Sequence, residues 1–153
     1  MTGDQAAERA ALGDEMLARA QASETQEFGS FFLSRLLGFE ISYAGETCSV
    51  RFEANSTLFN PQGTLHGGIL ATAMDISMGH LLHRLDGAGA TLEMKVQYLG
   101  AVTAGHVRCE GSILRRGRGI SFLQSHAFND DDKLVAHATA TWKLLRPPSV
   151  EYK

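Results

Sequence analysis

The chain has 153 residues, of which 44% are hydrophobic and 20% are charged, and its net charge is -3. This length builds one domain around a single core, which excludes a nucleotide-binding domain beside a separate substrate domain. The composition excludes a disordered, collagen-like or coiled-coil protein, and the mild acidity argues against a dedicated nucleic-acid binder.

Neither the apolar residues nor the cysteines point to a membrane or secreted protein. No run of about 18 apolar residues is present, so the sequence predicts no membrane-spanning helix. The acidic residues 1–27 lack the basic start and the apolar run of a secretory signal. Cys48 and Cys109 lie in alternating apolar stretches and are predicted to be buried small hydrophobes. We therefore expect a cytoplasmic protein.

The N-terminal part of the chain predicts two helices. Residues 4–24 are rich in alanine, and Leu12 and Met16 recur there at helical spacing. The other side of this helix is charged, so we expect it to pack weakly. A second short helix is predicted over residues 28–37, and Gly38 would end it.

The hydrophobic period then changes to two. Residues 39–43 and 48–52 alternate between apolar and polar side chains, and the turn between them completes a predicted hairpin. Residues 55–64 form a predicted loop with Pro61 and Gly63 as breakers.

Residues 67–85 carry the longest helical signal, and their apolar side chains occur on every side, which predicts a fully buried helix. Four alternating runs follow as predicted strands: 92–98, 107–113, 120–128 and 134–142. One long helix wrapped by a curved antiparallel sheet of five to six strands satisfies this order, in the α+β class. We assign residues 1–27 to a helical extension, 28–146 to the main domain and 147–153 to a C-terminal tail.

Gly67 and Gly68 stand where the loop enters the long helix. Glycine lets a ligand approach the backbone closely. The N–H groups of a first helical turn are unpaired and lie at the positive end of the helix dipole. These groups are therefore placed to donate hydrogen bonds to a carbonyl oxygen or an oxyanion. Tight packing of the helix against the sheet is the alternative explanation for the two glycines.

Asp75 lies in the middle of this apolar helix. A buried ionised carboxylate is costly unless it is paired or functional, so Asp75 is a candidate nucleophile or general base for water. Alternatively, the Asp75 carboxylate has no catalytic role and contacts solvent or a structural partner. Eight residues separate Gly67 from Asp75, which is about 12 Å along a helix and too far to serve one carbonyl. The spacing therefore predicts a homodimer in which Asp75 of one chain meets Gly67 of the other.

The segment 60–75, with its His-Gly-Gly triplet and the later Asp75, resembles the PaaI-like branch of the hotdog-fold acyl-CoA thioesterases. The run 91–99 resembles the strand that follows the central helix in this family. The resemblance covers about residues 38–145. It implies a hotdog fold in which the long helix is wrapped by the sheet.

The resemblance implies catalytic roles for five residues. The N–H of Gly67 would polarise the thioester carbonyl, and Asp75 of the facing subunit would attack the carbonyl or activate water. Asn60 would orient water or the thioester, and Thr91 matches the small hydroxyl residue near the acid. His66 would shape the loop or help to bind the thioester. Enzymes of this kind use no metal or separate cofactor, since coenzyme A is part of the substrate, and they form homodimers or homotetramers.

Further candidates for substrate binding are Gly68 beside the carbonyl, Phe59 and Met78 at the acyl group, and Arg115, Arg116 and Arg118 at the phosphates of coenzyme A. Alternatively, the three arginines lie in an ordinary solvated turn and bind no substrate. Met78 is alternatively a core residue that fills space. The stretch after Tyr98 departs from the family, because many relatives have an arginine or proline there and this chain has Leu99-Gly100.

The leading prediction is hydrolysis of an acyl-CoA to a free acid and coenzyme A, with no nucleic-acid or membrane partner. One alternative is a hotdog hydratase or dehydratase, in which His66 and Asp75 would move a proton. Another is a non-catalytic module that binds acyl-CoA. Small aromatic and medium-chain acyl groups both remain candidates. His80 and His83 could face one metal, but no third ligand has suitable spacing, so no metal site is predicted.

Overall fold

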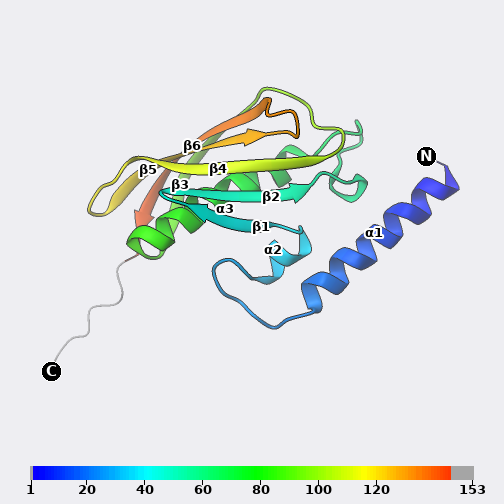
Figure 1. The fold of residues 1–153 in the computed structure, drawn as a ribbon, viewed down its shortest axis with the longest axis horizontal. Coiled ribbons are helices and arrows are strands. Elements are labelled where there is room, and N and C mark those ends of the chain that lie inside the picture. Colours follow the sequence, from blue (N-terminus) through cyan, green and yellow to red (C-terminus); the bar gives the residue numbers. More distant parts are fainter. Residues whose placement is uncertain (1, 146–153) are drawn as a thin grey trace.

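The computed structural model describes residues 2–145 and has one long helix packed against a six-stranded antiparallel sheet (Figure 1). The elements in chain order are α1 (Gly3–Gln21), α2 (Phe32–Leu36), β1 (Glu40–Ala44), β2 (Thr47–Glu53), the 3-10 helix η1 (Ser56–Leu58), α3 (Gly67–Asp86), β3 (Gly89–Tyr98), β4 (His106–Arg115), β5 (Ile120–Phe128) and β6 (Leu134–Leu144). The expected order of a hairpin, one long helix and four strands is confirmed.

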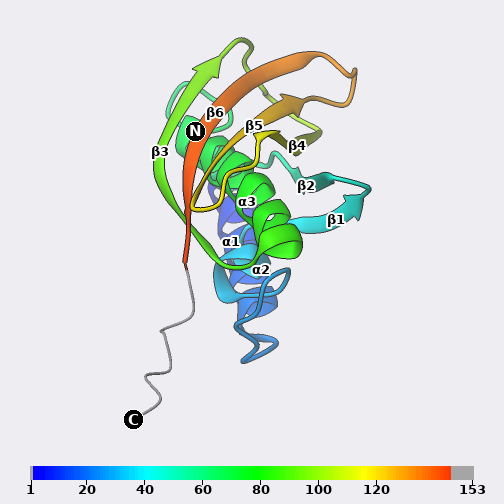
Figure 2. The ribbon, with the colours of Figure 1, turned by 90° about the vertical axis from the view of Figure 1, so that its left-hand side faces the viewer.

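The strand order in the sheet is β1-β2-β4-β5-β6-β3. The strand β3 follows α3 directly in the chain but lies at an edge of the sheet, beside β6. Within residues 2–145, β3 therefore has a strand neighbour on one side only. Figure 2 shows the sheet curving around α3, as the hotdog arrangement requires.

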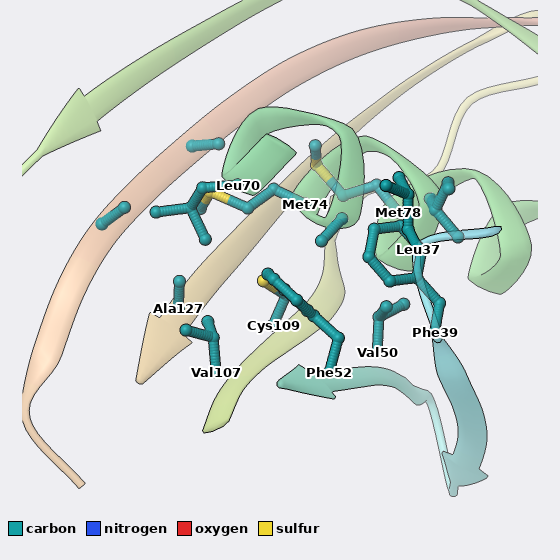
Figure 3. Close-up of a cluster of buried hydrophobic side chains, with 14 of the residues drawn as sticks. Leu37, Phe39, Val50, Phe52, Leu70, Met74, Met78, Val107, Cys109 and Ala127 are labelled. Carbon is teal, nitrogen blue, oxygen red and sulfur yellow. The ribbon is translucent and has the colours of Figure 1, made fainter. Parts of the chain in front are cut away.

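The core lies between α3 and the concave face of the sheet (Figure 3). Leu70 and Met74 point from α3 towards side chains of β2 and β4, which include Val50, Phe52, Val107 and Cys109. Burial of these apolar surfaces is the main force that holds the helix in the sheet. Cys48 and Cys109 are buried free thiols, as predicted. Burial raises the pKa of Cys48 to about 12, so this thiol stays protonated at neutral pH.

The helix α1 lies beside the sheet and α3 rather than within these layers (Figure 1). Met16 and Ala20 are its buried residues, which confirms the expected weak packing. Arg35 of α2 holds the connection from α1, because its guanidinium donates hydrogen bonds to the carbonyls of Ala20, Ser23 and Thr25.

The predicted helix over residues 28–37 begins only at Phe32, so its first turn was predicted wrongly. Gly29 has a positive φ of 90°, and its N–H donates to Nε2 of His80 over 2.9 Å. Burial lowers the pKa of His80 to about 4, so the imidazole is neutral and can accept this bond. His83 stacks on Phe28 with ring centroids 3.5 Å apart.

The middle of α3 is buried, but the expectation of burial on all sides is only partly correct. Gly68 is exposed, and Thr72 and Asp75 are half-buried, because the sheet wraps α3 incompletely (Figure 2). These residues form an uncovered stripe along the N-terminal half of the helix. None of the helices in residues 2–145 is long and apolar enough to cross a membrane.

Candidate active site

A cleft of about 400 Å³ opens at the N-terminal end of α3. The loop before α3, the first turns of α3 and the end of β3 line it, through Asn60, Thr64, Leu65, Gly67, Leu70 and Tyr98–Val102. Two predicted site residues, Asn60 and Gly67, thus share one cleft. Phe59 lines a neighbouring cleft of about 830 Å³, which Asn60 also borders and which α1 closes on one side.

Asn60 shapes the loop that precedes α3. Its Oδ1 accepts hydrogen bonds from the N–H groups of Gln62 and Thr64 over 2.9 and 3.3 Å. Its Nδ2 donates to the hydroxyl of Thr64 over 3.0 Å. Gly63 completes this turn with a φ of 79°, a conformation that favours glycine. Both amide atoms of Asn60 are therefore engaged in holding one wall of the cleft.

His66 is the N-cap of α3 and satisfies most of the first turn. Its Nδ1 accepts from the N–H of Gly68 over 2.9 Å. Its carbonyl accepts from the N–H groups of Ile69 and Leu70 over 3.0 and 3.3 Å. The N–H of Gly67 has no hydrogen-bond acceptor within residues 2–145. This donor remains available at the positive end of the helix dipole.

Asp75 is half-buried and contacts β3. Oγ1 of Thr91 donates a hydrogen bond to Oδ1 of Asp75 over 2.8 Å. Burial raises the pKa of Asp75, and the hydrogen bond from Thr91 partly opposes this effect. The structure thus brings the predicted acid and the predicted hydroxyl residue together.

Gly67 and Asp75 remain separate within one chain. Both lie on α3, roughly 12 Å apart along the helix axis. Each contacts β3 at a different point, Gly67 at Tyr98 and Asp75 at Thr91. One chain therefore presents two separate groups of candidate site residues along the contact between α3 and β3. His66 lies at the Gly67 end, so the structure gives no support to a proton-transfer pair of His66 and Asp75 in one chain.

Tyr98, for which the sequence predicts no role, lies in the cleft. Its hydroxyl donates to the carbonyl of Gly67 over 2.8 Å. A Cβ on Gly67 would lie 3.1 Å from Cζ of Tyr98, so a larger residue at this position would push against the tyrosine ring. Tyr98 is 53% exposed, and its place at the end of the alternating run 92–98 was the signal available in the sequence.

The three predicted arginines lie at the other end of α3. Nε of Arg116 donates to Oδ2 of Asp86 over 3.0 Å, and its Nη1 lies 3.6 Å from Oε1 of Glu46. Arg115 and Arg118 are exposed and form no salt bridge with any residue in the range 2–145. Two of the three guanidinium groups are therefore available to a ligand.

Met78 has no exposed surface and packs in the core, so its position matches the plain-core alternative. It lines neither of the two clefts beside the start of α3. His80 and His83 are engaged with residues of the segment before α2, as described above. No group of three metal-ligating side chains gathers within the described part of the chain.

The chain is similar to known proteins over most of its length. It is 26% identical over 131 residues to the medium/long-chain acyl-CoA thioesterase YigI of Escherichia coli K12, and this covers 72% of the chain and 84% of YigI. Its structure superposes on the conserved protein PA5202 of Pseudomonas aeruginosa with a TM-score of 0.73 at 31% identity, covering 79% of this chain and 99% of PA5202.

The same fold occurs in BH2602 of Bacillus halodurans, a protein solved with CoA. The TM-score is 0.81 at 22% identity, and the match covers 96% of this chain and 97% of BH2602. Residues 62–136 match the thioesterase superfamily, and this range contains Gly67, Asp75, Thr91 and Tyr98. With this match and its hotdog fold, the chain belongs to the thioesterase superfamily.

Proposed function

We propose that the protein is an acyl-CoA thioesterase of the PaaI-like branch, which hydrolyses its substrate to a free carboxylic acid and coenzyme A. The observation that carries this proposal is the pair of half-sites on α3. One is the half-buried Asp75 carboxylate with its raised pKa. The other is the N–H of Gly67 at the cleft, which has no hydrogen-bond acceptor within residues 2–145. The name of YigI and the CoA in BH2602 support acyl-CoA as the substrate class.

In the proposed reaction the N–H of Gly67 donates a hydrogen bond to the thioester oxygen as negative charge develops on it. Asp75 of the second chain either takes a proton from the attacking water or attacks the carbonyl carbon itself. In the first route the water oxygen bonds to the carbonyl carbon, the C–S bond breaks and the sulfur leaves as a protonated thiol. In the second route the Asp75 oxygen bonds to the carbonyl carbon, the C–S bond breaks, and the thiolate of coenzyme A leaves and takes a proton from solvent. Water then hydrolyses the resulting anhydride, which releases the carboxylic acid and restores the Asp75 carboxylate.

A second copy of the chain completes the site in this proposal. The strand β3 is an edge strand, and Leu92, Tyr98 and Leu99 at this edge are 57%, 53% and 57% exposed. Long edge strands with exposed apolar residues readily pair with another chain. Antiparallel pairing of two β3 strands would carry the Thr91 end of one chain towards the Tyr98 end of the other. The homodimer is the smallest assembly with complete sites, and a homotetramer would contain two such dimers.

The exposed Arg115 and Arg118 are proposed to bind the phosphates of coenzyme A. They lie near the C-terminal end of α3, because the neighbouring Arg116 bonds to Asp86, the last residue of the helix. This end is roughly 16 Å from Asp75 along the helix and roughly 28 Å from Gly67 of the same chain. The arginines therefore belong with the Asp75 half-site, which the second chain would supply.

Thiol release from a panel of acyl-CoA substrates tests the proposed activity. The panel should contain small aromatic groups and short, medium and long aliphatic chains, and size-exclusion chromatography should accompany it. We expect turnover of at least one substrate by an assembly of two or more chains. Binding of acyl-CoA without release of thiol would favour a binding module. Formation of an enoyl product without release would favour a hydratase or dehydratase.

Mixing two inactive variants tests whether the site lies between chains. We expect dimers of Asp75→Asn with Gly67→Pro chains to recover about one half of the wild-type activity, because one of their two sites is intact. Different affinity tags on the two chains allow these mixed dimers to be isolated after co-expression. Each variant paired with itself is the control. If the mixed dimers stay at the level of these controls, the site does not combine Gly67 and Asp75 from different chains.

A further inference from the structure

The two peptide groups that flank Gly67 contain four polar groups, and three of them are hydrogen-bonded. The carbonyl of His66 accepts from the N–H groups of the next helical turn, with the shortest bond at 3.0 Å. The carbonyl of Gly67 accepts from Tyr98 over 2.8 Å, and the N–H of Gly68 donates to His66 Nδ1 over 2.9 Å. The fourth group, the N–H of Gly67, has no acceptor within residues 2–145.

Two consecutive glycines at a helix start have unusual backbone freedom. Without other contacts, the peptide group between them could tilt as the first turn frays. In this protein that peptide is held at its oxygen by Tyr98 of β3 and at its N–H by the imidazole of His66. The preceding peptide, between His66 and Gly67, is held through the His66 carbonyl, which accepts hydrogen bonds from the next helical turn. Both planes next to Gly67 therefore have a fixed orientation.

We propose that Tyr98 is a positioning residue of the active site. Its hydroxyl and the His66 imidazole hold the Gly67–Gly68 peptide at both ends, and the His66 carbonyl holds the preceding peptide, which carries the Gly67 N–H. With both peptides held, the direction of this N–H is fixed. The inference rests on the proposed function, because it assigns that N–H to the thioester oxygen. A donor with a fixed orientation stabilises a developing oxyanion without rearrangement, so Tyr98 acts on kcat more than on substrate binding.

The ring and the hydroxyl of Tyr98 have separable roles. The ring packs against the Cα of Gly67, since a Cβ there would lie 3.1 Å from Cζ and 3.2 Å from Oη of Tyr98. Phenylalanine would keep this ring contact and remove the hydrogen bond to the Gly67 carbonyl. The substitution Tyr98→Phe therefore isolates the hydroxyl.

We expect Tyr98→Phe to lower kcat roughly 3- to 10-fold on the best acyl-CoA of the panel, with KM and Tm unchanged, as the loss of one hydrogen bond predicts. Tyr43→Phe is the matched control, because it removes a tyrosine hydroxyl from β1, at the opposite edge of the sheet. This control should keep the wild-type kcat. An unchanged kcat in Tyr98→Phe, or a change confined to KM or Tm, would overturn the positioning role.

Two substitutions of His66 test the hydrogen bond between its imidazole and the N–H of Gly68. Asparagine is a good N-cap, because its side-chain oxygen can accept the hydrogen bond from the Gly68 N–H, whereas alanine cannot. We therefore expect His66→Asn to recover most of the kcat that His66→Ala loses. Equal losses in both variants would mean that the imidazole does something other than hold this peptide.

A measurement on the backbone distinguishes this inference from the proposed function. In 15N relaxation experiments on the full chain, Tyr98→Phe is expected to increase the picosecond-to-nanosecond motion of the Gly67 and Gly68 amides, and Tyr43→Phe is not. Unchanged order parameters of these amides in Tyr98→Phe would contradict the positioning role of Tyr98, whether or not the protein hydrolyses a thioester. Absence of turnover by the wild-type protein on every thioester, with mobile amides in Tyr98→Phe, would contradict only the proposed function.

Discussion

Replacing Asp75 with asparagine is expected to lower kcat/KM for the best acyl-CoA by about 10²- to 10⁴-fold, the usual contribution of an acid or base group. Asparagine keeps the shape of the side chain and an oxygen that can accept the hydrogen bond from Thr91. It cannot take a proton from water or attack a carbonyl. Steady-state thiol release measures the effect, and Asp131→Asn in the exposed turn after β5 is the matched control.

The same substitution is expected to leave Tm unchanged or to raise it. Because burial raises the pKa of Asp75, the ionised form is disfavoured in the folded chain, and the charge lowers stability at neutral pH. As the pH falls through this raised pKa, the folded protein binds the proton more readily than the unfolded chain does. The stability gain of Asp75→Asn over wild type should therefore shrink in acid, while wild-type activity falls. Wild-type turnover by the variant would remove Asp75 from the mechanism.

Removing the Gly67 N–H with Gly67→Pro is expected to lower kcat by about 10²- to 10³-fold, as the loss of one oxyanion donor does. The backbone suits proline at this position. His66 has φ -64° and ψ 128°, in the extended region that a residue before proline prefers. Gly67 is the first helical residue, where proline is common because its missing N–H has no helical partner.

Gly67→Ala is the matched control for the proline variant. Both substitutions add a Cβ that must displace the Tyr98 ring, but alanine keeps the N–H. Alanine should therefore lower kcat less than proline, and the difference between the two measures the N–H donor. Circular dichroism and Tm would show that both variants fold. Equal kcat values for the two variants would mean that the Gly67 N–H does not act on the thioester.

Local periodicity was sufficient to predict the elements from α3 onwards, whose bounds agree with the structure to within three residues. Apolar residues at helical or alternating spacing are a property of neighbouring positions, so they can be read without the fold. In the segment 28–37, local periodicity is not sufficient to predict the structure. Its first turn is not helical, since Gly29 has a φ of 90°, and the N–H of Gly29 bonds to His80, a residue 51 positions later in the chain.

For the candidate site, too, the sequence predicts some features and not others. The positions of Gly67 at a helix start and Asp75 two turns later follow from the spacing within one helix, and so does the conclusion that one chain cannot complete the site. The partners of these residues do not follow from spacing. Thr91 reaches Asp75 and Tyr98 reaches Gly67 because β3 folds back along α3.

The amino-acid pattern thus established the fold class, the family resemblance and the two chemical groups of the site, since all three depend on residue types at short separations. Folding decided which groups meet. Arg116 forms ion pairs with Asp86 and Glu46, Met78 is buried in the core, and Tyr98 contacts Gly67. Such contacts depend on strand order and on packing across the whole chain, which no local stretch of sequence encodes.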